Sequence, residues 1–238
     1  MMEVGNLFNK ARNFMALGIG TLAILAAAAT ARADGGDGFY ADVHGGAGIP
    51  FEEGARVSSD SALTSLNAHT NYSVGWLAGA SAGYAWNLWN QGFATEFEFT
   101  FRQNHVDRIA TNAGPALTEG GDLHSYDMML NQYYRFRNPS PFTPYIGGGI
   151  GESSVALNNT RPVGGLDTGP FSGTDAVLAY QGIAGVAYPI APHLSLAAEY
   201  RYFATLRPGF EQNVANRDLK ISPSYAVNNV LLRMVYAF

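Results

Sequence analysis

Apolar and polar positions alternate with a period of two near the end of this chain, in Asn229–Phe238. One face of that segment carries the apolar and aromatic side chains Val230, Leu232, Met234, Tyr236 and Phe238. The other face carries Arg233 among smaller residues. This period predicts a β-strand. An outer face of apolar and aromatic residues, with polar residues opposite, is typical of a strand that faces lipid on one side.

The same alternation appears in seven further segments of about 10 residues or slightly more, the length of a tilted membrane strand. These segments are Gly38–Phe51, Tyr72–Trp86, Gly92–Arg102, Leu123–Phe136, Tyr145–Val155, Ala176–Tyr188 and Leu194–Phe203. The pattern is clearest in Gly92–Arg102, where phenylalanines alternate with Glu96 and Glu98. The facing of Tyr145–Val155 is ambiguous, because that segment is rich in glycine.

The connections between these segments alternate in length. The short ones are Asn87–Gln91, Arg137–Pro144 and Pro189–His193. The long ones are Glu52–Asn71, Gln103–Asp122, Ala156–Asp175 and Ala204–Pro223. Short periplasmic turns, long external loops and an even strand number are the pattern of outer-membrane barrels. The sequence therefore predicts an all-β fold, an eight-stranded antiparallel up-and-down transmembrane β-barrel.

A soluble up-and-down barrel of the lipocalin type is the alternative architecture. It would turn the apolar faces inward, crowd many aromatic rings into a small interior, and leave Glu96, Glu98 and Glu199 in water. It also gives no reason for the asymmetric loops or for an aromatic residue at position 238. The membrane barrel is the better interpretation.

The first 33 residues have the three-part layout of a secretory signal peptide. Basic Lys10 and Arg12 precede an uncharged apolar run, Phe14–Ala29, and the small-residue site Ala31-Arg32-Ala33 follows. The run is shorter than the roughly 20 residues of a membrane helix, although an uncleaved anchor is the alternative. We expect cleavage near Ala33, which divides the chain into a signal peptide, 1–33, and a barrel domain, 34–238.

Composition narrows the classes of partner and chemistry. The formal charge of −5 becomes −7 once Glu3 and the three basic residues of the leader are removed, and no basic block remains. This balance argues against nucleic acid as a partner. The chain has no cysteine and its five histidines stand apart, so we expect no disulfide, no metal site and no cofactor. Charged residues make up only 14%, against about 25% in soluble domains.

Six segments together resemble a known family. They are TEFEFTFR (Thr95–Arg102), MMLNQYYRF (Met128–Phe136), PFTPYIGGGIG (Pro141–Gly151), LAYQGIAGVAY (Leu178–Tyr188), LSLAAEYRYF (Leu194–Phe203) and NVLLRMVYAF (Asn229–Phe238). In this order they resemble the eight-stranded outer-membrane barrels of Gram-negative bacteria, the OmpA-like and opacity-type surface proteins. The resemblance implies an integral protein of the bacterial outer membrane, in contact with its lipid and lipopolysaccharide.

The resemblance further implies folding by the barrel assembly machinery, which reads a terminal aromatic residue. Tyr236 and Phe238 are the expected assembly signal. OmpA itself carries a second, periplasmic domain that binds peptidoglycan. Because this sequence ends on its last predicted strand, we do not expect that function here.

Charged residues fall on the predicted inward faces of the strands. They are Glu96, Glu98, Arg102, Asp127, Arg135, Glu199, Arg201 and Arg233. Side chains fill the interior of an eight-stranded barrel, and charges there must be paired or hydrated. We therefore predict a structural ion-pair network in the lumen, in which Arg233 can meet Glu199 on a neighbouring strand. A narrow or gated pore is the alternative.

Enzymatic activity is a weaker alternative, because some eight-stranded barrels modify lipid A with Ser and His. His193, Ser195 and Glu199 offer the residue types of such a site, but they lie on the predicted periplasmic side, whereas lipid A occupies the outer leaflet. We therefore expect a non-enzymatic protein with a structural and surface-interaction role. Its long loops can carry a surface ligand.

The long loops also contain cations that can touch lipopolysaccharide phosphates or act as ordinary solvated charges. They are Arg56, Arg108, Arg161, Arg207, Arg217 and Lys220.

Overall fold

A computed structural model describes residues 37–51, 53–59, 62–89, 91–111, 116–119, 121–162, 171–206, 210–214, 217–223 and 225–238. The predicted signal peptide, 1–33, lies outside the described residues. The strands are β1 (Gly38–Pro50), β2 (Glu53–Ser59), β3 (Ala62–Tyr72), β4 (Gly75–Leu88), β5 (Gln91–Thr111), β6 (Ala116–Glu119), β7 (Asp122–Arg135), β8 (Thr143–Pro162), β9 (Phe171–Ala191), β10 (Leu194–Thr205), β11 (Phe210–Val214), β12 (Arg217–Pro223) and β13 (Ala226–Ala237). Within the described part of the chain, no helix is long and apolar enough to span a membrane.

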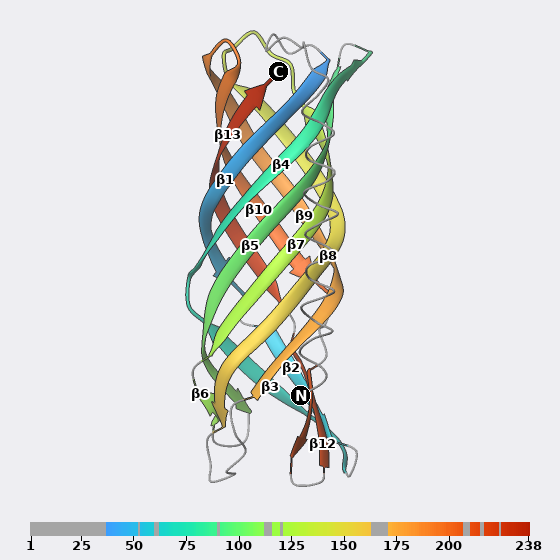
Figure 1. Ribbon diagram of the computed structural model, residues 1–238, viewed down its shortest axis with the longest axis vertical. Coiled ribbons are helices and arrows are strands. Elements are labelled where there is room, and N and C mark those ends of the chain that lie inside the picture. The colour runs from blue at the N-terminus through green and yellow to red at the C-terminus, as the bar shows by residue number, and fades with distance from the viewer. Residues whose placement is uncertain are drawn as a thin grey trace, which may run out of the picture.

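Eight long strands close into an antiparallel barrel in the order β1, β4, β5, β7, β8, β9, β10 and β13 (Figure 1). The last of them pairs back with the first, so that Val43 of β1 lies opposite Ala80 of β4 and Met234 of β13. Each of these eight strands corresponds to one predicted segment, and the predicted fold class is confirmed. Full closure leaves these strands without a free edge in lipid.

The strands are strongly tilted around the barrel. The register partner of Tyr40 on β4 can be followed from strand to strand around the barrel, and the path returns to β1 at Pro50. The shift along β1 from position 40 to position 50 is the stagger of the barrel. With eight strands, this stagger corresponds to a tilt of about 40° from the barrel axis. An interior of that size is filled by side chains.

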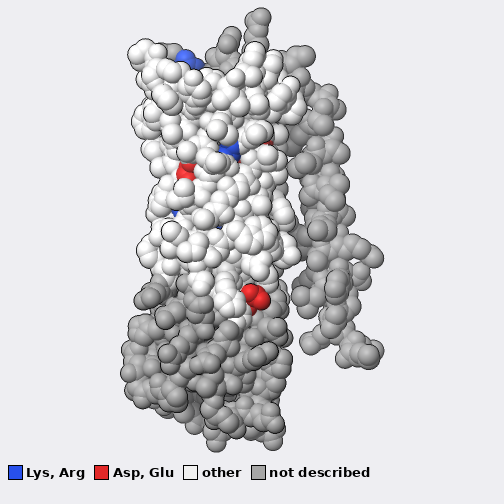
Figure 2. Space-filling view, turned by 90° about the vertical axis from the view of Figure 1, so that its left-hand side faces the viewer, with Lys and Arg blue, Asp and Glu red and all other residues white. Residues whose placement is uncertain are grey.

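Apolar side chains cover the outside of the barrel, as the alternation predicts. The more exposed large ones include Val43, Trp76, Phe97, Leu130, Ile150, Leu178, Val230, Leu232 and Met234. Figure 2 shows that, on one side, the described part of this surface is mostly uncharged, with only a few scattered Lys, Arg, Asp or Glu. Because charged side chains on the lipid face are destabilising, this surface suits a hydrocarbon environment.

Aromatic rings gather near both ends of this apolar surface. At the end with short turns, Phe39 packs on Tyr84 with ring centroids 4.9 Å apart, and Tyr236 packs on Phe238 at 5.2 Å. Toward the other end, Phe101 lies between Trp76 and Tyr126, with centroid separations of 5.3 and 5.1 Å. Two such belts mark the two membrane interfaces of an outer-membrane barrel.

The structure resolves the ambiguous facing of β8. Tyr145, Ser153 and Val155 point into the barrel and are buried, whereas Ile146 and Ile150 are exposed outside. Glycines occupy the inward positions between them, where a Cβ atom at Gly151 would lie 1.9 Å from the Met128 carbonyl oxygen. The glycines therefore let the side chains of the neighbouring strand β7 fill this part of the lumen.

The long connections are partly β-structure, which the sequence analysis did not predict. Strands β2, β3, β6, β11 and β12 lie in them, and β5, β8 and β9 run on past their predicted ends. Figure 1 shows β2, β3, β6 and β12 at the end of the barrel opposite the end of β13. Outside the membrane band a strand needs no apolar outer face, so the alternation that identifies barrel strands stops there. The three predicted short turns are confirmed, because only short segments join β4 to β5, β7 to β8, and β9 to β10.

Candidate functional site: the charged barrel interior

Arg233 lies at the centre of an ion-pair cluster in the half of the lumen nearest the short turns. Its two terminal nitrogens approach three carboxylates: Glu96 at 2.5 Å, Glu199 at 2.9 Å, and Asp42 in direct contact. These partners come from β5, β10 and β1, so one guanidinium of β13 joins strands on opposite sides of the barrel. Ser81 of β4 donates to Asp42 in the same cluster.

Three tyrosines complete the hydrogen bonding of this cluster. Tyr40 and Tyr133 each donate to Glu96 at 2.9 Å, and Tyr145 donates to Glu199 at 2.8 Å. A carboxylate accepts several hydrogen bonds and donates none, so these hydroxyls satisfy oxygen lone pairs that Arg233 does not reach. Hydrogen bonds to a charged acceptor are roughly twice as strong as neutral ones.

A second cluster fills the middle of the lumen. Arg201 contacts Glu98 at 2.5 Å and also Glu199, which links this cluster to the first. Glu98 accepts further hydrogen bonds from Thr100 and Asn131, both at 2.7 Å. The side chains of Glu98 and Arg201 have an exposed fraction of 0%. The cross-section of the barrel is therefore closed at this level by hydrogen-bonded side chains.

His44 bridges the two clusters. Its ring nitrogens lie 3.0 Å from Asp42 Oδ1 and 3.0 Å from Thr100 Oγ1, and Nε2 is 3.9 Å from Glu98. Among the described residues, the buried lumen holds more carboxylates than arginines. The imidazole lies between two of these carboxylates, Asp42 and Glu98.

The third cluster lies nearer the external end. Arg102 pairs with Asp127, which also accepts hydrogen bonds from Ser125 and Ser153. The guanidinium carbon of Arg102 lies 3.8 Å from the centre of the Phe203 ring, a cation–π contact. The ion pair with Asp127 and the contact of the guanidinium plane with the Phe203 ring together hold Arg102 in the lumen.

The structure brings together seven of the eight predicted lumen residues, and Arg233 donates to Glu199 as expected. The eighth, Arg135, lies apart from the clusters, at the mouth of the barrel near the short turns. Asp42 and His44 were not predicted as members of the network. Their place on the polar face of the first segment is the sequence signal by which they could have been found.

The residues considered for catalysis do not form a site. His193 Nδ1 is 3.0 Å from the Ala237 carbonyl oxygen, in the turn before β10. Glu199 is occupied by Tyr145, Arg201 and Arg233. In the part of the chain that the structure describes, no hydrogen bond joins His193 to Ser195 or Glu199, and no group of three or more His, Cys, Asp or Glu is placed to hold a metal ion.

A closed antiparallel barrel with lipid-compatible aromatics outside and paired charges inside defines an integral outer-membrane β-barrel protein. The comparisons agree. The family described as "Outer membrane protein beta-barrel domain" matches residues 19–238, and the chain belongs to this family. It is a protein of the bacterial outer membrane, as its relatives are.

One relative is an "Outer membrane protein" of Gluconacetobacter diazotrophicus, 32% identical over 177 residues, which cover 69% of this chain and 46% of that protein. Another is "Outer membrane protein PagN" of Salmonella typhimurium, 31% identical over 115 residues, covering 46% of this chain and 48% of that protein. The chain thus spans about half the length of the curated relatives it matches. Among solved structures, Neisserial surface protein A (NspA) is similar, with 19% identity, a TM-score of 0.47, and coverage of 85% of this chain and 99% of that one.

Proposed function

We propose that this protein is a non-enzymatic outer-membrane barrel whose external β-hairpins make surface contacts and whose lumen carries no steady ion current. The observation that supports a surface role is the length of its strands. β5 and β9 have 21 residues and β8 has 20, about twice the roughly 9–11 that cross a membrane. These strands therefore raise the hairpins well above the lipid surface.

A rigid barrel that presents hairpins in water is a suitable scaffold for recognition, because binding residues concentrate on connections held by a stable framework. The closed lumen supports the same proposal. Glu98, Arg201 and Asp127 are each joined to partners from other strands and have exposed fractions of 0%. An ion would have to break these pairs to pass, which makes a steady current unfavourable.

The proposed partners are inferred from the position of the protein in the outer membrane. Basic residues in the external connections, such as Arg108 and Arg161, are proposed to contact lipopolysaccharide phosphates. Tyr236 and Phe238, both exposed on the outer face near the short turns, are proposed to be read by the barrel assembly machinery.

The surface role is tested by shortening one hairpin. Residues 53–72, which contain β2 and β3, are replaced by a short Asn-Gly turn, and heat-modifiable migration verifies that the barrel still folds. We expect adhesion of expressing cells to epithelial monolayers to fall to the level of cells without the protein. Unchanged adhesion after each of the four external connections has been shortened in turn would overturn the proposal.

Planar-bilayer recording of the refolded protein tests the closed lumen. We expect no steady conductance from the unmodified chain. A steady current that Arg102→Ala changes would favour the small-channel alternative instead. A mass shift of lipid A that depends on Ser195 would favour the enzymatic alternative.

A further inference from the structure

A cavity of about 480 Å³ opens into the barrel from the end with the short turns, the periplasmic end. It lies on the opposite side of the ion-pair clusters from the external hairpins, so it is separate from the proposed surface role. Its volume falls within the roughly 300–1,000 Å³ range of small-molecule sites. The chemistry of its walls indicates which ligand it fits.

The walls of the cavity are cationic on one side and apolar on the other. Arg135, at the end of β7, contributes a positive charge. Ala187, Ala197 and Val235, from β9, β10 and β13, line the opposite wall. Ser195 and the ion-paired Arg233 also border it. Such a division suits a ligand with an anionic group at one end and an apolar body at the other.

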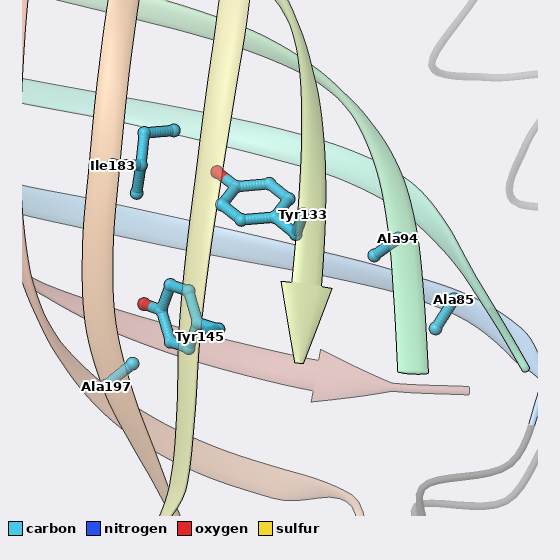
Figure 3. Close-up of a cluster of buried hydrophobic side chains, with 6 residues drawn as sticks. All are labelled: Ala85, Ala94, Tyr133, Tyr145, Ile183 and Ala197. Atoms are coloured by element: carbon cyan, nitrogen blue, oxygen red, sulfur yellow. The ribbon is translucent and has the colours of Figure 1, made fainter. Parts of the chain in front are cut away.

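The inner end of the cavity is formed by aromatic rings. Tyr133 and Tyr145 pack edge to face with centroids 5.8 Å apart. Figure 3 shows their hydroxyls directed away from Ala85 and Ala94, which lie nearer the mouth. These hydroxyls are engaged with Glu96 and Glu199, so the cavity meets ring surface rather than free hydroxyl groups.

Arg135 is the cation that this cavity offers to a ligand. Its Nε is buried and has no hydrogen-bond partner, and it takes no part in the ion pairs of the described residues. Gly92 makes room for it, since a Cβ atom there would lie 3.2 Å from Arg135 Nε. Arg137, by contrast, donates to Asn87 at 2.5 Å, and Asn87 in turn donates to Asp37.

The acidic residue that borders the cavity, Glu96, belongs to the ion-pair network of the lumen. Glu96 is paired with Arg233 at 2.5 Å and accepts hydrogen bonds from Tyr40, Tyr133 and Asn131. Its carboxylate oxygens are thereby already engaged inside the lumen. At the mouth, the guanidinium of Arg135 forms no ion pair among the described residues, and its planar fork matches a carboxylate.

We propose that the periplasmic mouth binds a small monocarboxylate with an apolar body. The carboxylate lies on Arg135, and the apolar body lies against Tyr133, Tyr145 and the alanines of the opposite wall. Desolvation of the apolar body and a charge-assisted hydrogen bond both contribute to binding. Because binding requires both the carboxylate and the apolar body, the site selects against anions that lack an apolar body and against apolar molecules that lack a carboxylate.

The test uses 4-(trifluoromethyl)benzoate as the probe, followed by ¹⁹F NMR, with the full barrel in lipid nanodiscs. Empty nanodiscs correct for partition into lipid. We expect saturable binding that weakens about tenfold or more in Arg135→Gln and about as much when the probe is the neutral 4-(trifluoromethyl)benzamide. Arg137→Gln, whose guanidinium is engaged with Asn87, is the matched control and should change binding less.

Two further measurements locate the site. Ala197→Phe fills the apolar wall and should abolish binding of both probes, and Ala187→Phe serves the same purpose if the first variant fails to fold. Inorganic phosphate should compete poorly, because it has no apolar body. Equal binding by the unmodified protein and Arg135→Gln, equal affinity for the benzamide, or full competition by phosphate would each overturn the proposal.

Discussion

Replacing Leu130 by arginine places a cation at the middle of the lipid-facing surface. Leu130 lies on the outer face of β7 with 54% of its surface exposed. Tyr126 and Tyr134 lie four residues away on either side, on the same face, and each packs in one of the two aromatic belts. Leu130 is therefore equidistant from the two membrane interfaces along its strand.

The register and tilt give the depth of this position. The eight residue steps from Tyr126 to Tyr134 span about 20 Å along the barrel axis, at about 3.3 Å per residue and a tilt of about 40°. Leu130 is then about 10 Å from either belt. An arginine at the midplane of a barrel costs about 2–4 kcal/mol, whereas near an interface it costs about 0–1 kcal/mol.

The free energy of unfolding is measured by urea titration in lipid vesicles, with the fluorescence of the three tryptophans as the signal. We expect Leu130→Arg to lower the free energy of unfolding by about 2–4 kcal/mol relative to the unmodified protein. Tyr126→Arg should lower it by about 0–1 kcal/mol relative to Tyr126→Leu, a reference variant that corrects for the lost ring packing. Equal losses at the two positions would refute the assigned depth. No loss at Leu130 would refute its lipid-facing orientation.

Two further predictions concern the interior. Gly151→Ala should destabilise the barrel by about 1–3 kcal/mol, because its Cβ atom would meet the Met128 carbonyl oxygen. Gly182→Ala should change the free energy of unfolding by no more than about 0.5 kcal/mol, because nothing lies within 4 Å of the added Cβ atom. Urea unfolding compares the two variants, and equal losses would contradict the facing of β8 and β9. Arg102→Met should cost about 3–5 kcal/mol because it leaves Asp127 buried without a cation, and adding Asp127→Asn should recover part of that loss in the same titration. A double variant no more stable than Arg102→Met would count against the pair.

The strands and their facing could be predicted because membrane insertion imposes a strict period of two. A lipid-facing position must be apolar and an inward one need not be, so Phe97 and Glu96 could be assigned to opposite faces from sequence alone. The same alternation placed Glu199 and Arg233 on inward faces. Their contact could be predicted because the last two barrel strands, β10 and β13, are neighbours.

The remaining features depend on information that the alternation does not carry. The facing of β8 stayed open because Gly147, Gly149 and Gly151 have no side chain to mark a face. The hairpins beyond the membrane were missed because strands in water can be polar on both faces. The contact between Arg233 and Asp42 depends on closure of β13 on β1 and on the stagger of the whole barrel, to which every register contributes.

The most direct test of the ion-pair lumen is a double-mutant cycle on Arg233 and Glu96, which are 137 residues apart in sequence and 2.5 Å apart across the interior. The cycle compares the unfolding free energies of Arg233→Met, Glu96→Gln and the double variant with that of the unmodified protein. Contacting residues in one network typically couple by about 0.5–3 kcal/mol. We predict a coupling of at least about 1 kcal/mol; additivity within about 0.3 kcal/mol would contradict the account.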